Sequence, residues 1–124
     1  MSWSVDLFIV SEKPLQTIAK DISYMLNLPV IKLECDEEAY FLEKTGSQLV
    51  VGYNDLVNDR DLLLESYNII VSIWSTKLPD WQSSEEECRN IGGRLFEKFK
   101  EFYRTGLLLT ENAQKRLMTF DPNF

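Results

Sequence analysis

The sequence predicts an α+β fold, a two-layer sandwich in which two main helices pack on a mostly antiparallel sheet. The expected elements follow the order β-α-β-β-β-β-α, with one further β segment at the end. Two segments have the three- and four-residue apolar spacing of amphipathic helices, and short alternating or β-branched segments separate them. Only the first β-α-β unit could be parallel, because the later strands follow one another as hairpins. The 124 residues are the usual size of one domain, so residues 1–124 are expected to form a single globular unit.

The first half of the chain is expected to hold one helix and four strands. The helix is predicted at residues 14–26 and the strands at 5–10, 30–35, 40–44 and 49–53. The first strand is almost continuously apolar, which is typical of a strand buried on both faces. The helix buries a stripe that includes Leu15, Ile18 and Ile22, and it ends before Pro29, which disfavours helical geometry in the preceding residue. Thr45-Gly46-Ser47 is the glycine-containing loop of a hairpin.

The second half is expected to hold a clear strand, a linker, the second helix and a weaker terminal hairpin. These are predicted at residues 67–74, 76–83, 84–105, and 107–110 with 115–120, after a polar stretch at 54–65 that fits a short helix or a loop. Ser84-x-x-Glu87 has the spacing of a capping box, and Glu85 to Glu87 would favour the positive end of the helix dipole. The expected buried stripe of this helix consists of Cys88, Ile91, Leu95, Phe99 and Phe102. Gly92 and Gly93 suggest a close approach of helix to sheet, since each costs a helix roughly 1 kcal/mol relative to alanine.

Acidic residues are concentrated in the middle of the chain. Residues 34–88 carry thirteen acidic and three basic side chains, a local charge of −10 within a total of −7. Such a field disfavours nucleic acid and anionic membranes as partners, and it favours a basic protein surface. Once charges assigned to the helix start and to strand surfaces are set aside, two loop clusters remain. These clusters are Asp36, Glu37 and Glu38, and Asp55, Asp59 and Asp61.

The composition provides little material for catalysis. The chain has no histidine, so a Ser-His or Cys-His pair cannot form, and it has no Gly-rich phosphate loop. We therefore expect no enzymatic activity, no cofactor and no metal. One alternative is a metal-dependent hydrolase in which Asp55, Asp59 and Asp61 gather magnesium or calcium. The segment does not match an EF-hand loop, and a solvated acidic loop is the simpler interpretation.

The two cysteines, Cys35 and Cys88, are 53 positions apart and match no zinc or redox spacing. Two free thiols packed as small apolar residues would suit a reducing cytosol, and a disulfide between them is the alternative. The N-terminal residues lack the features of a signal peptide, and no stretch approaches the ~20 apolar residues that span a bilayer. The sequence thus predicts a soluble, cytoplasmic protein.

Exposed aromatic residues beside charge are frequent anchors of protein interfaces. Trp81 lies in the predicted linker beside Asp80, and Tyr53 closes a predicted strand before Asn54 and Asp55. The alternative for both is that they cap the edge of the core. The basic residues of the second helix could suggest a nucleic-acid face, but Glu97 and Glu101 interrupt them at spacings that favour pairs within the helix.

A small, acidic α+β chain without catalytic residues resembles, in general type, the immunity proteins of bacterial contact-dependent inhibition and related polymorphic toxin systems. The resemblance covers the whole chain and involves no signature motif. It implies a cytoplasmic protein that binds and neutralises one cognate toxin domain, commonly a basic nuclease. The alternative is an adaptor or structural subunit of a cytoplasmic assembly. The residues expected to bind the partner are Asp36, Glu37, Glu38, Tyr53, Asp55, Asp59, Asp61 and Trp81.

Overall fold

The helices and strands follow one another along the chain in the predicted order. The computed structural model describes residues 4–33, 39–44, 47–54, 64–75, 81–112 and 115–122. The helices are α1 (Leu15–Leu26) and α2 (Trp81–Phe102), with a 3₁₀ turn η1 at Leu64–Ser66. The strands are β1 (Val5–Ile9), β2 (Val30–Leu33), β3 (Ala39–Lys44), β4 (Ser47–Tyr53), β5 (Ile69–Ser75), β6 (Leu107–Glu111) and β7 (Lys115–Phe120). The predicted α+β fold class is confirmed.

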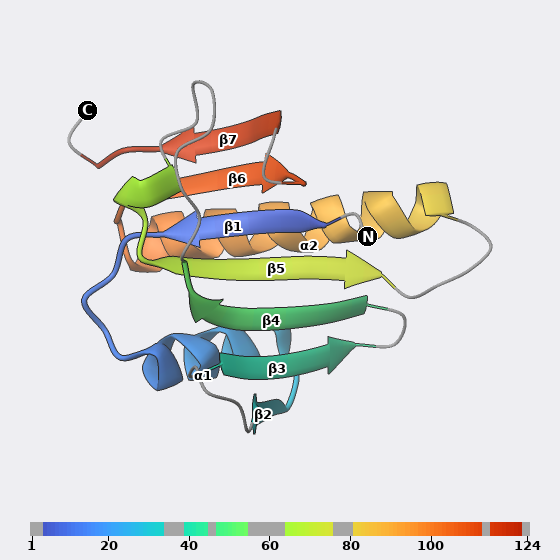
Figure 1. Cartoon of the computed structure of the whole chain (residues 1–124), viewed down its shortest axis with the longest axis horizontal. Helices are drawn as coiled ribbons and strands as arrows, with labels where there is room; N and C mark the ends of the chain where they lie inside the picture. The colour runs from blue at the N-terminus through green and yellow to red at the C-terminus, as the bar shows by residue number, and fades with distance from the viewer. Residues whose placement is uncertain are drawn as a thin grey trace.

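The strands in the described residues form one sheet with the order β2-β3-β4-β5-β1-β6-β7 (Figure 1). Every neighbouring pair is antiparallel. Strands β1 and β2 point in the same direction, as the β-α-β unit allowed, but β3, β4 and β5 lie between them. The sheet therefore has no parallel pair within the described residues, and the first strand of the chain lies near its centre.

Strand β1 is buried on both faces, as predicted. All five of its residues are buried, because β5 and β6 flank it and both of its faces are covered. Val5, Leu7 and Ile9 belong to the main core beneath the helices. On the opposite face, Phe8 joins a smaller cluster, whose other buried members are Leu64 and Leu108.

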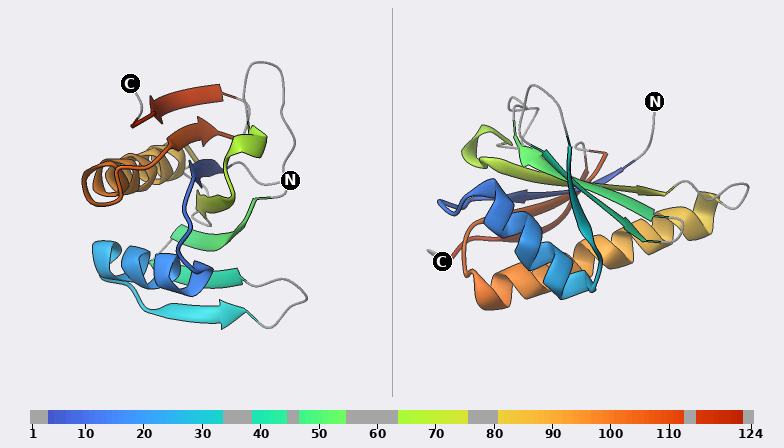
Figure 2. Two further views of the ribbon diagram at one scale, coloured as in Figure 1. Left: turned by 90° about the vertical axis from the view of Figure 1, so that its left-hand side faces the viewer. Right: turned by 90° about the horizontal axis from the view of Figure 1, so that it is seen from below.

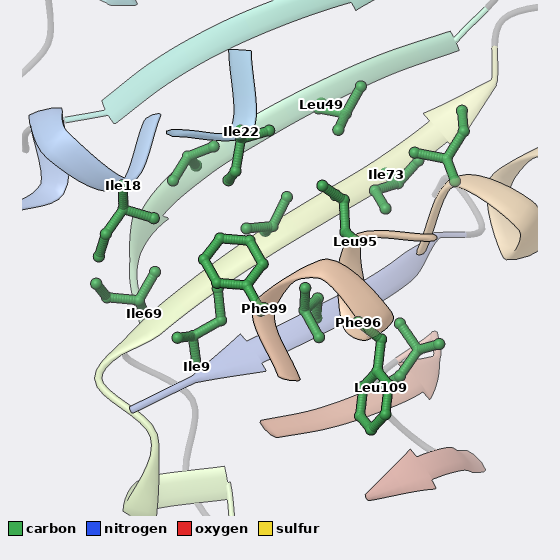
Figure 3. Close-up of a cluster of buried hydrophobic side chains, with 14 of the residues drawn as sticks. Ile9, Ile18, Ile22, Leu49, Ile69, Ile73, Leu95, Phe96, Phe99 and Leu109 are labelled. Atoms are coloured by element: carbon green, nitrogen blue, oxygen red, sulfur yellow. The ribbon is translucent and has the colours of Figure 1, made fainter. Parts of the chain in front are cut away.

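Both helices pack on the same face of the sheet (Figure 2). Helix α2 contacts β5, β1 and β6, whereas α1 contacts β3, β4 and β2. Apolar side chains of both helices meet those of the strands in one continuous core (Figure 3).

Helix α1 follows the sequence pattern closely. Its buried residues are Leu15, Ile18, Ala19 and Ile22, which is the predicted stripe. Asn27 ends the helix in the left-handed conformation with φ 54°, so its backbone and that of Leu28 can bond the last turn. Pro14 precedes the helix as its cap residue, so the helix begins one position after the predicted start.

Helix α2 begins at Trp81, so the prediction of a linker up to residue 83 and a start at Ser84 is wrong. Ser84 lies inside the first turn and does not cap it, and no acidic residue lies in that turn. The Ser84-x-x-Glu87 spacing does not distinguish a helix start from a helix interior, because residues three positions apart are also neighbours on the surface of a helix. Glu85 to Glu87 are therefore charges on the helix surface, and their attraction to the helix dipole is weaker than expected.

One aromatic residue also differs from the prediction. Phe102 was expected in the buried stripe of α2, but it is the last residue of the helix and its side chain is 64% exposed. Phe96 is buried in the core. Tyr67 precedes β5, and its ring lies 6.0 Å from that of Phe8, on the face opposite the helices.

Cys88 is a free cysteine buried in the core, as predicted, whereas Cys35 lies outside the described residues.

Candidate functional site

Most of the residues expected to bind a partner lie outside the part of the chain that the structure describes. These are Asp36, Glu37, Glu38, Asp55, Asp59 and Asp61. Tyr53 is the last residue of β4, and half of its side chain is exposed (50%), as an interface anchor requires. Trp81 begins α2 and does not lie in a linker.

The strand ends that flank the two acidic clusters are neighbours at one end of the sheet. Leu33 ends β2 and pairs with Ala39, the first residue of β3. Ala39 also pairs with Gly52, which is two residues before Asn54. The chain therefore enters the first cluster from β2 and the second from β4, the strands on either side of β3, at the end of the sheet where β1 and β4 end and β3 and β5 begin (Figure 1).

Asn54 joins the residues on either side of the second acidic cluster. Its side-chain amide donates hydrogen bonds to the carbonyl oxygens of Leu64, at 2.7 Å, and Tyr67, at 2.8 Å. Its backbone N–H donates to the carbonyl oxygen of Asn68 at 2.9 Å. Both N–H groups of the side-chain amide are thus used, and they hold together the parts of the chain that precede and follow residues 55–63.

Asn68 fixes the neighbouring connection between β1 and α1. Its side-chain amide donates to the carbonyl oxygen of Ser11 at 2.6 Å, and the Ser11 backbone N–H donates to its Oδ1 at 2.9 Å. No role for Asn54 or Asn68 was predicted from the sequence. Asparagines that border a polar segment are a known turn signal, and this signal could have indicated both positions.

A groove of about 620 Å³ lies between the two helices. Its lining residues are Lys13, Asp21, Tyr24, Met25, Lys98, Phe102 and Tyr103. A second hollow shares Lys13, Phe102 and Tyr103 with it and continues to Val10 and Thr105. We call this continuous depression the helix groove.

Large apolar side chains are exposed around the helix groove. Tyr24 is 89% exposed, Phe102 is 64% exposed and Val10 is 38% exposed. Tyr53 is the remaining exposed large apolar side chain among the described residues. The sequence did not indicate this surface, because the apolar spacing of the second helix placed Phe102 in its buried stripe.

Polar contacts at the floor of the groove connect the two helices. The Tyr103 hydroxyl donates to the Asp21 carboxylate, and the Lys13 ammonium lies 3.9 Å from the same carboxylate. Lys13 also lies 4.2 Å from the centroid of the Tyr103 ring, a cation–π distance. Burial, followed by the bond to Asp21 and its negative charge, raises the pKa of Tyr103. These groups hold the walls of the groove in place.

Basic residues of α2 make contacts within the molecule. The Arg89 guanidinium donates to the Glu111 carboxylate on β6 and forms an ion pair with it. The Lys100 ammonium lies 5.5 Å from the centroid of the Phe120 ring on β7. Arg89 and Lys100 thus both interact with the last two strands of the sheet.

Titratable residues do not gather into a metal centre in the described ranges, where no three His, Cys, Asp or Glu side chains are placed to hold an ion. Asp55, Asp59 and Asp61, which the hydrolase alternative needs, lie outside these ranges.

Comparisons with protein families, with curated proteins and with solved structures found no match for the chain. Among the described residues, neither helix has the length and apolar character needed to cross a membrane.

Proposed function

We propose that the chain is a non-enzymatic protein of the immunity type, which acts in the cytoplasm by binding and neutralising a cognate basic toxin domain of the nuclease class. The contact is made by the two acidic clusters, Asp36 to Glu38 and Asp55, Asp59 and Asp61. The observation that carries the proposal is the pairing of Ala39 with both Leu33 and Gly52, which brings the flanks of the two clusters together at one end of the sheet.

Neighbouring flanks allow six carboxylates that are far apart in the sequence to act on one partner. Their combined field steers a basic surface toward this end of the sheet and raises the association rate, and this effect weakens as salt is added. A nuclease surface that binds phosphate is rich in Lys and Arg, so the carboxylates compete with the nucleic acid for the same side chains.

Two further features of this end of the sheet support the proposal. The hydrogen bonds from Asn54 to Leu64 and Tyr67 hold together the parts of the chain that flank the second cluster. Tyr53, half exposed beside Asn54, offers an apolar anchor that would slow dissociation.

The test begins with purification of the tagged chain from its native host, where we expect one basic protein domain at equal stoichiometry. Reversal of charge at Asp36, Glu37 and Glu38, or at Asp55, Asp59 and Asp61, should weaken its binding and reduce the salt dependence. The matched control reverses three exposed charges on α2, namely Glu86, Glu97 and Glu101, and should leave binding nearly unchanged. Equal affinity and equal salt slopes in both sets of variants would refute the electrostatic mechanism.

The alternative, an adaptor or structural subunit, is favoured by one observation, the exposed apolar rings around the helix groove. An adaptor would bind its partner through Tyr24 and Phe102, and the charge reversals above would not affect that contact.

A further inference from the structure

Strand β7 forms one edge of the sheet (Figure 1). Among the described residues, β6 is the only strand that pairs with β7, so the outer side of β7 faces no other strand there. Strand β7 has six residues, whereas β2 at the opposite edge has four. An edge strand offers backbone N–H and C=O groups that an added strand can bind. Strand β7 is therefore the longer of the two edges at which a further strand could join the sheet.

The hydrogen bonds between β1 and β6 show which backbone groups of β7 point outward. The Val10 N–H donates to the carbonyl oxygen of Gly106 at 3.0 Å, so Gly106 directs its backbone groups toward β1. Successive residues of an antiparallel strand face opposite neighbours, so Leu107 faces β7, where it pairs with Phe120. The residue before Phe120 is Thr119, which therefore directs its N–H and C=O away from the sheet. Its side chain is exposed as well.

The start of β7 is basic in an acidic chain. Lys115 and Arg116 are both exposed there. Glu111, which pairs with Lys115 across the ladder to β6, forms its ion pair with Arg89 of α2. Residues 89–124 together carry seven basic and four acidic side chains, a charge of +3 in a chain of net charge −7. An acidic segment is thus repelled by most of the molecule and attracted to this edge.

Apolar side chains of β7 continue the core toward the edge. Leu117, Met118 and Phe120 are partly buried and pack against the main core. Apolar residues of an added strand beside Met118 and Phe120 would cover the sides of these two residues that remain exposed. The basic residues lie at the start of β7 and the apolar residues follow them, so the edge specifies the order of residues in a strand that joins it.

We propose that β7 binds an extended segment of a partner protein, which joins the sheet as an antiparallel strand with apolar residues first and acidic residues at its C-terminal end. In this direction the carboxylates face Lys115 and Arg116, and the apolar residues lie beside Met118 and Phe120. A lysine on an edge strand discourages pairing with apolar or basic strands, which leaves an acidic segment as the preferred occupant. This proposal is independent of the proposed toxin binding, because that contact lies at other strands and requires a basic partner.

The test is a titration of the isotope-labelled chain with the end-capped peptide Val-Thr-Val-Thr-Glu-Glu, followed by NMR of the backbone amides. We expect saturable chemical-shift changes that are largest at Thr119, and weaker binding as salt is added. Lys115→Glu should weaken binding about fivefold or more, because it replaces an attraction with a repulsion. Lys20→Glu is the matched control, since it makes the same charge change at an exposed position of α1, and it should leave binding nearly unchanged.

Two methylated peptides separate backbone pairing from attraction between charges. Each carries methyl groups on alternate backbone nitrogens, so one peptide loses the N–H groups that face β7 and the other loses those that face away. The first should lose binding and the second should keep it, although both have the same charge. Equal affinity of the two methylated peptides would overturn the proposal, as would a parent chain without shifts in β7 or an unchanged affinity in Lys115→Glu. Since Lys115 is exposed, its variant should keep the circular dichroism spectrum of the parent.

Discussion

Gly92 of α2 lies against Val5 of β1 so closely that a methyl group on Gly92 would be 2.8 Å from the Val5 Cγ1 atom. The same methyl group would be 3.0 Å from Cδ1 of Leu109 on β6. The helix therefore crosses the centre of the sheet at a distance that only glycine permits. A methyl group on Gly93, in contrast, would meet nothing within 4 Å. The predicted close approach is confirmed for Gly92 and wrong for Gly93.

Alanine substitutions at the two glycines should have opposite effects on stability. Gly92→Ala should lower the free energy of unfolding by up to about 2 kcal/mol, because overpacking of about 1–3 kcal/mol offsets the gain in helix propensity of about 1 kcal/mol. The stiff, β-branched Val5 cannot easily move aside. Gly93→Ala should raise the free energy of unfolding by up to about 1 kcal/mol. Urea denaturation measures both, and equal effects of the two substitutions would contradict the packing at Gly92.

Tyr103→Phe should weaken the connection between the two helices. The substitution keeps the ring, which packs edge-on against Phe99 with centroids 4.6 Å apart, but it removes the donor to Asp21. Asp21 is partly exposed and can be hydrated, so we expect a loss of only about 1 kcal/mol in the free energy of unfolding. Tyr24→Phe is the control, since its side chain is 89% exposed. It should change stability by less than about 0.5 kcal/mol, and an equal loss in the two variants would refute a role for the bond to Asp21.

Stability should fall as the pH rises through the alkaline range because of Cys88. Burial, followed by the charges of Glu87 and Glu85, raises the pKa of its thiol from 9.0 to about 11. Below pH 9 both the folded and the unfolded thiol are protonated. Between pH 9 and about 11 only the unfolded thiol loses its proton, so the unfolded state binds fewer protons and stability decreases by about 2 kcal/mol in total.

Urea denaturation of the parent and of Cys88→Ala, measured across this pH range, checks the effect. The variant should lose less stability between pH 9 and 11 than the parent. Part of the decrease should persist in it, since the raised pKa of Tyr103 acts in the same direction above pH 10. Parallel curves for the two proteins would contradict a protonated, buried Cys88.

Asn54→Asp should destabilise the base of the second acidic cluster. The substitution replaces an amide that donates to the Leu64 and Tyr67 carbonyl oxygens with a carboxylate that faces them. We expect a loss of about 1–3 kcal/mol in the free energy of unfolding, since two acceptors lose their donors. Asn90→Asp makes the same chemical change at an exposed position of α2 and should have little effect. Hydrogen exchange at the amides of Tyr67 and Asn68 should increase in the first variant alone.

Part of the proposed partner surface could be predicted from the spacing of apolar residues, and part depends on how the strands pair. Tyr53 was identified from the sequence because it closes an alternating strand, and it is half exposed there. The proximity of the strand ends that flank the two acidic clusters could not be predicted, because it depends on the pairing of Ala39 with Gly52. The hydrogen-bond partners of Asn54 and Asn68 could not be predicted for the same reason, since they lie in segments that meet only in the folded chain.

The sequence by itself determined the type and order of the elements and the buried face of α1, because these follow from local spacing of apolar residues. It also determined that β1 is buried on both faces. The tertiary structure alone decided that β1 lies between β5 and β6, that Gly92 rather than Gly93 touches the sheet, and that Phe102 leaves the buried stripe to line a groove. It likewise brought Tyr103 to Asp21 across 82 positions of the chain. Local periodicity states which face of a segment is apolar, but the choice of what covers that face is made by packing between segments that are distant in sequence.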